Sequence, residues 1–195
     1  MNFVVEALLY KALADVVSLL EREGIPYALI GGLAASLRGQ PRITADIDLV
    51  ILSDVDRVLK LASDLGATEF RPLFIDPTEV IQRSFILPLR HRTTNIKVDL
   101  AIGLSGFERQ AIARAKPMHV AETIVSVATA EDLLIFKVLA GRPQDQEDIQ
   151  GLVVAQGDRL DWDYCLDTAS QLQQAIGHDL VESIRKLRDD QRFDD

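Results

Sequence analysis

The sequence predicts an α+β protein in which a mixed β-sheet is flanked by helices and followed by a C-terminal helical bundle. Helical and strand-like patterns alternate up to residue 128, whereas only helical patterns occur from residue 129 to residue 195. The chain is 48% hydrophobic and 26% charged, which is typical of an ordinary globular protein. We therefore expect an α/β core over 1–128 and a helical subdomain over 129–195 packed on it.

The first part of the chain reads as a long helix followed by two pairs of a strand and a helix. Residues 3–22 place Leu9, Leu13, Val16 and Leu20 on one stripe of a helix. The elements expected next are a strand over 27–30, a short helix over 33–38, a strand over 46–52 and a helix over 55–65. Residues 67–82 contain two prolines and give no clear prediction.

The remaining elements follow from turn and capping residues. Two strands over 84–91 and 95–103 are joined by a polar turn, and Ser105 with Glu108 has the spacing of a capping box that begins a helix over 105–115. One or two strands are expected over 118–128. Helices are then expected over 133–140, over 143–155 with Pro143 in the first turn, over 162–176 and over 179–189.

The charge of the chain is uneven. The formal net charge is −9, of which residues 1–128 carry −1 and residues 129–195 carry −8. An acidic C-terminal third is a poor general surface for nucleic acid, although a local basic patch in the first part could hold a phosphate or an RNA end. The single cysteine, Cys165, excludes an intrachain disulfide and fits a reducing cytoplasm. No signal peptide and no membrane span is expected, so the predicted location is cytoplasmic without a membrane partner.

Three acids in two strands are the main indication of chemistry. Side chains alternate along a strand, so Asp46 and Asp48 share one face of the strand over 46–52. Lys97 and Asp99 share one face of the strand over 95–103 in the same way. If the two strands are neighbours, three carboxylates converge, and hard oxygen ligands of this kind suit Mg²⁺ or Mn²⁺. Two such ions about 4 Å apart would serve a phosphoryl or nucleotidyl transfer.

Two glycines between the first strand and the following helix suggest a phosphate site. Gly31 and Gly32 would let the backbone approach a phosphate and present N–H groups at a helix N-terminus. A plain turn is the alternative for the glycines. Arg42 and Thr44, just before the acids, either contact phosphate or shape the turn.

The joint pattern resembles a known superfamily. The stretch "IGGLAAS…RITADIDL" resembles the signature of the nucleotidyltransferase superfamily that includes DNA polymerase beta, and "VDLAIG" fits its third carboxylate strand. "DLLIFKVLAGRPQDQEDI", residues 132–149, is similar to a second signature of the AbiEii-like branch, whose members include toxins of type IV toxin–antitoxin systems. The resemblance covers about residues 25–150 and implies a nucleotidyltransferase-like fold.

The resemblance also implies roles for individual residues. The metal ligands and catalytic acids would be Asp46, Asp48 and Asp99, with Asp99 favouring loss of the acceptor proton. The nucleotide ligands would be Gly31, Gly32, Ser36, Thr44 and Lys137. The residues that orient the substrate or the other groups would be Arg42, Arg142, Asp145 and Asp148.

Several of these residues have a plainer interpretation. Lys137 could lie on the solvated stripe of its helix, and Asp145 and Asp148 could complement a helix dipole. Residues 90–92, Arg-His-Arg, could contact an acceptor or RNA, or form the solvated tip of a hairpin.

The function that we expect is metal-dependent transfer of a nucleoside monophosphate from a nucleoside triphosphate to an acceptor hydroxyl, with release of pyrophosphate. The acceptor stays open among a small molecule, a tRNA 3′ end and a protein side chain. The alternative is a non-catalytic nucleotide-binding or regulatory member of a toxin–antitoxin pair, with a cognate antitoxin as its partner.

Overall fold

The computed structural model describes residues 3–177 and 179–191, which fall into two compact units. The first unit comprises Met1–Leu33 and Ile43–Val127, and the second comprises Ala34–Arg42 and Ala128–Asp195. We describe each unit by itself. The expected division of the chain into a core over 1–128 and a subdomain over 129–195 stays a prediction.

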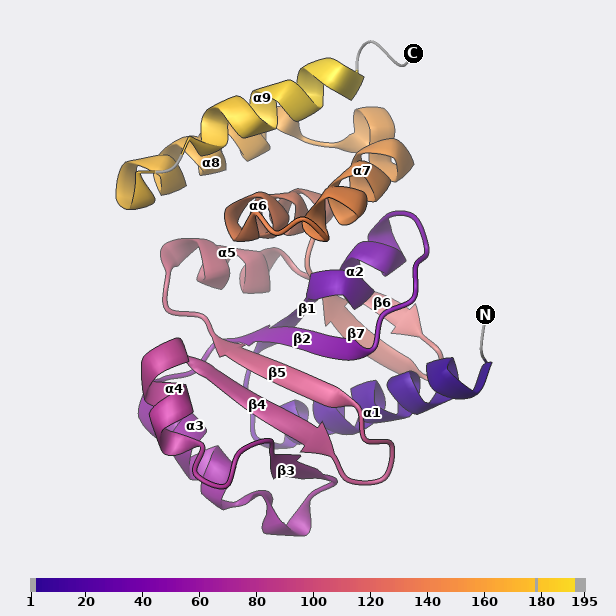
Figure 1. Ribbon diagram of the computed structural model, residues 1–195, viewed down its shortest axis with the longest axis vertical. Helices are drawn as coiled ribbons and strands as arrows, with labels where there is room; N and C mark the ends of the chain where they lie inside the picture. Colours follow the sequence, from indigo (N-terminus) through magenta and orange to yellow (C-terminus); the bar gives the residue numbers. More distant parts are fainter. Residues whose placement is uncertain (1–2, 178, 192–195) are drawn as a thin grey trace. The chain divides into compact units, whose positions relative to one another are not determined.

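The first unit is built on a seven-stranded mixed sheet with the order β3-β4-β5-β2-β1-β7-β6 (Figure 1). β1 pairs with β7 and β2 pairs with β5 in parallel, and the other neighbours are antiparallel. The strands are β1 (Tyr27–Ile30), β2 (Asp46–Ile51), β3 (Phe70–Pro72), β4 (Ile86–His91), β5 (Lys97–Ile102), β6 (Lys116–Val120) and β7 (Thr123–Val127). The predicted mixed sheet flanked by helices is confirmed.

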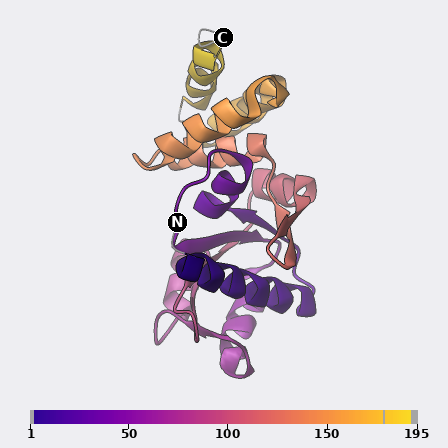
Figure 2. The same cartoon turned by 90° about the vertical axis from the view of Figure 1, so that its right-hand side faces the viewer.

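The helices of the first unit are α1 (Phe3–Arg22), α3 (Val55–Ser63), α4 (Thr78–Ser84) and α5 (Gly106–Arg114). Figure 2 shows α1 running along the sheet, and it contacts β2. The apolar stripe of α1 is confirmed, since Leu13, Val16 and Leu20 are fully buried. The predicted capping box of α5 is also present, with Ser105 and Glu108 each satisfying the backbone of the other.

The alternation of side chains in the two central strands separates the core from the acids. Ile47 and Leu49 of β2 and Val98 and Leu100 of β5 are completely buried. The residues between them on the same strands point to the other face of the sheet. The sheet therefore buries one row of apolar side chains and leaves the row that carries the acids less covered.

Residues 67–82, which gave no prediction, contain the edge strand β3 and the helix α4. β3 has only three residues and is defined by its antiparallel pairing with β4. α4 begins after Pro77, and the amide of its first residue, Thr78, donates to Asp76 Oδ1 at 2.9 Å. Such short elements carry too few residues for a periodic pattern, so only the pairing in space reveals them.

Arg92 of the Arg-His-Arg sequence lies exposed in the turn after β4, whereas the interpretation as a solvated hairpin tip is wrong for His91. His91 is fully buried in β4. Its Nδ1 accepts from the Thr94 amide at 3.2 Å, and its Nε2 lies 2.9 Å from Asp15 Oδ2. Arg90 donates to the Asn95 carbonyl and Arg92 to the Thr68 carbonyl. The three side chains therefore fix the structure around β4 separately.

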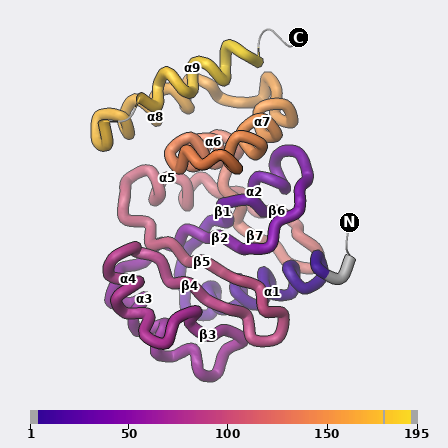
Figure 3. Tube along the Cα trace, in the orientation of Figure 1, coloured from indigo at the N-terminus to yellow at the C-terminus, as the bar shows by residue number. Residues whose placement is uncertain are grey.

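The second unit is helical. Its helices are the C-terminal part of α2 (Gly31–Arg38), then α6 (Ala130–Ala140), α7 (Asp145–Gln156), α8 (Trp162–Ile176) and α9 (Leu180–Gln191). α8 and α9 pack side by side (Figure 3). None of the helices within the described ranges is long and apolar enough to cross a membrane. The expected helical bundle after residue 128 is confirmed.

The end of α2 joins the second unit through backbone contacts. Arg38 Nε donates to the Ala128 carbonyl at 2.9 Å. Gly39 crosses α7 at Gly151, and a Cβ on Gly39 would lie 2.9 Å from the Gly151 carbonyl carbon. Glycine at this crossing lets the two backbones meet without a side chain between them.

The start of α7 differs from the prediction. The helix begins at Asp145 and not at Pro143, because the preceding residues form a turn closed by Asp145. The Asp145 amide donates to the Arg142 carbonyl at 2.9 Å, and the Asp145 carboxylate accepts from the Arg142 amide at 3.2 Å. Pro143 therefore lies in the loop before α7 and not in the first turn of the helix.

Candidate active site

Two acids of the first unit stand next to each other on parallel strands. Asp48 of β2 is the register partner of Asp99 of β5, and Asp46 is the register partner of Lys97. Neighbouring strands in a sheet lie about 4.8 Å apart, so the backbones of Asp48 and Asp99 are adjacent. All four side chains share the face opposite the buried core row. The structure thus makes the two strands neighbours, which is the condition for the predicted convergence of the acids.

Lys97 provides a cation on this face, next to the acids. Its Nζ lies 2.6 Å from Asp99 Oδ2, and the two side chains are 33% and 22% exposed. Burial alone would lower the pKa of Lys97, but the hydrogen bond to Asp99 and the charges of Asp99, Asp46 and Asp48 raise it above its ordinary value. All three predicted acids therefore act electrostatically on one ammonium group.

The second oxygen of Asp99 lacks a hydrogen bond. Asp99 Oδ1 is buried and has no partner within the described residues. The strands on both sides explain this, because the register partner on β4 is Pro88, which has no N–H, and the partner on β2 is the acid Asp48. A buried carboxylate oxygen in such surroundings is costly unless a cation or a donor reaches it.

Gly31 is fitted against Asp48. It begins α2 with a φ of +69°, and a Cβ built on it would lie 2.7 Å from the Asp48 Cβ and Cγ. A side chain at this position would be strained by the backbone conformation and would overlap the carboxylate. The sequence placed the glycines between strand and helix; the structure places Gly31 and Gly32 in the first turn of α2.

The residues of this face fit a divalent cation by their chemistry. Asp48 and Asp99 offer hard oxygen atoms side by side, one of these oxygens is buried without a partner among the described residues, and Gly31 has no Cβ that would push the Asp48 carboxylate aside. Over the described residues, no three His, Cys, Asp or Glu side chains are arranged as a finished metal site. A divalent cation at this face would therefore require the side chains to rearrange, starting with the Lys97 ammonium.

The second unit contains a buried ion network around Lys137. Its Nζ lies 2.9 Å from Asp145 Oδ1 and 2.6 Å from Asp148 Oδ2, and its side chain is only 5% exposed. Lys137 therefore does not lie on a solvated stripe, and this alternative is wrong. The dipole interpretation of Asp145 and Asp148 is incomplete as well. Both occupy the first turn of α7, but both are buried in ion pairs.

Two arginines complete the network from the outside. Arg42 forms a bidentate pair with Asp148, with its Nη2 2.8 Å from Asp148 Oδ2. Arg142 donates from Nε to Asp145 Oδ2 at 2.8 Å. The hydrogen bond to Asp148 raises the pKa of Arg42, which keeps the guanidinium charged despite its partial burial. Each buried carboxylate is thus held by Lys137 on one side and by an arginine on the other.

This arrangement makes the two buried acids strongly acidic. Burial alone would raise the pKa of Asp145, but the hydrogen bonds and charges of Arg142 and Lys137 lower it to about 2. Burial likewise opposes the charge of Asp148, and its bonds to Arg42 and Lys137 lower its pKa. Both carboxylates are therefore ionised near neutral pH.

The two hydroxyls predicted to bind nucleotide have local partners. Ser36 Oγ accepts from the Arg42 amide at 3.1 Å, which ties α2 to the loop after it. Thr44 Oγ1 donates to the Asp46 carbonyl at 3.4 Å. Both contacts shape the segment that leads to β2, and the roles of Ser36 and Thr44 in nucleotide binding stay predictions.

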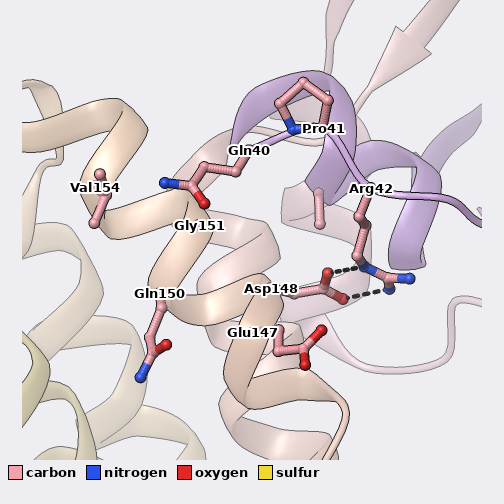
Figure 4. A pocket seen from close by; sticks show the side chains of 9 residues that line it. Gln40, Pro41, Arg42, Glu147, Asp148, Gln150, Gly151 and Val154 are labelled. Atoms are coloured by element: carbon pink, nitrogen blue, oxygen red, sulfur yellow. Dashed lines mark hydrogen bonds and ion pairs between the residues drawn. The ribbon is translucent and has the colours of Figure 1, made fainter. Parts of the chain in front are cut away.

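The second unit also has a cavity of about 330 Å³ that the sequence did not indicate (Figure 4). Its lining comes from the end of α2, the loop after it and one side of α7: Ala35, Gln40, Pro41, Arg42, Glu147, Asp148, Gln150, Gly151 and Val154. Two of the residues predicted to orient a substrate, Arg42 and Asp148, thus border a cavity. The cavity lies near the place where Gly39, just after α2, approaches Gly151 of α7 closely.

We predict that Gly31→Ala lowers the free energy of unfolding by about 1–3 kcal/mol, because the new Cβ is both strained and in collision with Asp48. Gly66→Ala is the control, since a Cβ there meets nothing within 4 Å. Urea denaturation of both variants measures the difference. Equal small effects would mean that the contact between Gly31 and Asp48 relaxes at no cost.

We predict that Lys137→Met lowers the free energy of unfolding by about 3–5 kcal/mol, because two buried carboxylates lose their shared cation. Lys186→Met is the control, since Lys186 is exposed and lies 3.9 Å from Glu182. That variant should lose less than about 1 kcal/mol in the same urea denaturation. A loss as small for Lys137→Met as for the control would contradict the role of Lys137 as the internal counter-ion.

The low pKa of Asp145 predicts how stability falls in acid. The carboxyl of Asp145 has an ordinary pKa of 3.8 in the unfolded chain and a pKa of about 2 in the folded protein. The contribution of Asp145 is therefore complete above about pH 4 and is lost as the pH falls toward about 2. The stability difference between the parent and Asp145→Asn should shrink over this range, as measured by denaturation at a series of pH values. The difference between the parent and the exposed control Asp158→Asn should change less; a parallel course for the two variants would refute the assignment.

Comparison with known proteins gives a family and supports the fold. The model of a family described as "Nucleotidyltransferase of unknown function (DUF6036)" matches residues 8–177. Comparison with curated proteins gives no match. The fold is similar to that of an antigenic nucleotidyltransferase-like protein from Paracoccidioides brasiliensis, with a TM-score of 0.51, 20% identity, and 90% of this chain and 91% of the other covered.

A second solved structure has the same degree of likeness. It is ANT(2″)-Ia in complex with adenylyl-2″-tobramycin, with a TM-score of 0.51, 14% identity, and 93% of this chain and 95% of the other covered. At these identities the two structures support the fold alone, whereas the family model covers most of the chain. The chain therefore belongs to the nucleotidyltransferase family DUF6036.

Proposed function

We propose that this protein transfers a nucleoside monophosphate from a nucleoside triphosphate to an acceptor hydroxyl, with release of pyrophosphate and with Mg²⁺ or Mn²⁺ bound by Asp46, Asp48 and Asp99. The observation that carries the proposal is the register of β2 and β5. It puts Asp48 beside Asp99 and both aspartates of β2 on the face of Asp99, in a chain of a nucleotidyltransferase family. The orphan oxygen of Asp99 supports a cation there.

Each residue has a part in the proposed reaction. The N–H groups of Gly31 and Gly32, at the start of α2, bind phosphate oxygens of the nucleotide. Bound divalent cations would neutralise the phosphates and stabilise the charge that develops in the transfer. Asp46 and Asp48 hold the nucleotide end of the site, and Asp99 favours loss of the acceptor proton. Because Gly31 lies against Asp48, the phosphate-binding backbone and the acid keep a fixed distance.

Lys137 and Arg42 of the second unit are the residues whose part in nucleotide binding is least directly supported. Lys137 was expected to bind the triphosphate, and that role stays a prediction. Its side chain is 5% exposed and contacts both Asp145 and Asp148, so in this conformation it positions these acids. Arg42, held by Asp148, has a side chain that is 35% exposed and is the more accessible cation of the network. Measuring the nucleotide affinity of Lys137→Ala and of Arg42→Ala would show which of the two cations binds the triphosphate.

The acceptor is the open part of the proposal. The structure of ANT(2″)-Ia contains an adenylylated tobramycin, which makes a hydroxylated small molecule our first choice. A tRNA end is the second, because the acidic C-terminal third does not favour nucleic acid but a local basic patch would be enough. The direct experiment incubates the protein with nucleoside triphosphates labelled in the α-phosphate, with Mg²⁺ or Mn²⁺, and with separate metabolite, RNA and protein fractions of a cell extract. The fraction that acquires label identifies the acceptor class.

The same experiment addresses the alternative of a non-catalytic member of a toxin–antitoxin pair. Retained nucleotide binding without label in any fraction would favour that alternative. The presence of all three acids in the predicted register supports a working enzyme instead.

We predict that Asp48→Asn loses transferase activity by several orders of magnitude, because a ligand of the charge-stabilising cations is removed. Without metal the variant should be at least as stable as the parent, since one of two adjacent like charges is gone. Its gain in melting temperature on addition of Mg²⁺ and nucleotide should also be smaller. Asp56→Asn, which changes an exposed acid of α3, is the control for activity and for the thermal response. If Asp48→Asn is less stable without metal but keeps the full metal and nucleotide response, Asp48 is a structural acid.

A further inference from the structure

The contact between Lys97 and Asp99 is unusual in its setting. Both residues lie on β5, two positions apart on one face, and the ammonium lies 2.6 Å from Asp99 Oδ2. The face also holds Asp46, the register partner of Lys97, and Asp48, the register partner of Asp99. One ammonium thus sits among three carboxylates, and the four side chains together carry a net charge of −2.

Among the described residues, Lys97 is the one cation that is hydrogen-bonded to Asp99. Across the sheet its neighbours are Pro88 and Asp48, and neither offers a hydrogen-bond donor side chain. Arg90, the register partner of Lys97 on β4, donates to the Asn95 carbonyl at 3.0 Å. Asp99 Oδ1 stays buried without a partner in the described chain. Lys97 therefore satisfies one oxygen of Asp99 and leaves the other for a further ligand.

The side chain of Lys97 is exposed enough to move away from Asp99. Its side chain is 33% exposed, and a lysine carries its charge on a flexible four-carbon stem. Lys137 in the second unit is the opposite case, since it is 5% exposed and held by two carboxylates. A half-exposed pair such as Lys97 with Asp99 contributes little to stability, usually below about 1 kcal/mol. Stability alone thus gives little reason for this lysine.

We propose that Lys97 is a resident counter-cation of the carboxylate site, which holds Asp99 while divalent metal is absent and is displaced from it when Mg²⁺ or Mn²⁺ binds. The inference rests on the proposed function in one respect, namely that the metal binds at Asp99. It adds that Lys97 competes with the metal and so sets the metal affinity of the site. Lys97 is a positioning residue in this role, because it acts through Asp99.

Two measurable consequences follow from competition for one carboxylate. Removal of the Lys97 charge should increase the affinity for metal, because the ion no longer has to displace an ammonium or bind beside it. It should also lower stability only while metal is absent, because the acids then repel one another without a cation. A purely structural lysine would change stability equally with and without metal.

The test is binding of Mn²⁺ alone, without nucleotide, measured from the electron paramagnetic resonance signal of the unbound ion. Lys97→Met removes the charge and keeps the length of the side chain, and Lys97→Gln is the replacement if that variant does not fold. Lys97→Arg keeps the charge. Lys11→Met is the matched control, because Lys11 lies 3.0 Å from Asp15 in the same unit, outside the carboxylate face. Thermal melts of all variants with and without Mn²⁺ are recorded in parallel.

We expect Lys97→Met or Lys97→Gln to bind Mn²⁺ about tenfold more tightly than the parent, and Lys97→Arg and Lys11→Met to bind it about as the parent does. We also expect Lys97→Met to melt lower than the parent without Mn²⁺ and to recover with it. Unchanged or weaker binding by both neutral variants would overturn the inference and leave the metal site of the proposed function standing. Absence of Mn²⁺ binding in the parent and in every variant would overturn both.

Discussion

The parallel register of β2 and β5 puts two carboxylates, Asp48 and Asp99, next to each other, and Lys97 and Gly31 are arranged around this pair. Like charges on neighbouring strand positions repel each other unless cations or donors compensate them. The neighbouring residue Pro88 offers no donor, and a buried oxygen of Asp99 stays without a hydrogen bond. Positive charge placed next to Asp48 and Asp99 would therefore stabilise this part of the sheet.

The surrounding backbone is adapted to the same spot. Gly31 begins α2 in a left-handed conformation directly against the Asp48 side chain, where any Cβ would collide. The N–H groups at the start of a helix favour anions, while the acids favour cations. A cation bound to phosphate satisfies both, which is the physical link between this geometry and nucleotidyl transfer.

In the second unit, buried acids are compensated by cations of the protein itself. Lys137 is enclosed with Asp145 and Asp148, and Arg42 and Arg142 hold the same two acids from the outside. Removing one partner from an ion pair buried as deeply as that of Lys137 with Asp145 leaves an uncompensated charge and is strongly destabilising. The molecule therefore contains a mostly buried ionic network of helices and, on the sheet, a partly exposed ionic group around Lys97 and Asp99. The first is suited to holding a scaffold, and the second to binding ligands.

The sequence by itself determined the elements with strong periodicity and the residues that share a strand face. The stripe of α1, the alternation that separates Asp46 and Asp48 from Ile47 and Leu49, and the helical character after residue 128 are all local patterns. The family resemblance was readable for the same reason, since its signatures are short and local. Only the tertiary structure decided which strands pair, and hence that Asp99 lies beside Asp48. It also decided the burial of His91 and Lys137 and the short elements β3 and α4, because burial and strand pairing depend on contacts between residues far apart in the chain, which no local pattern encodes.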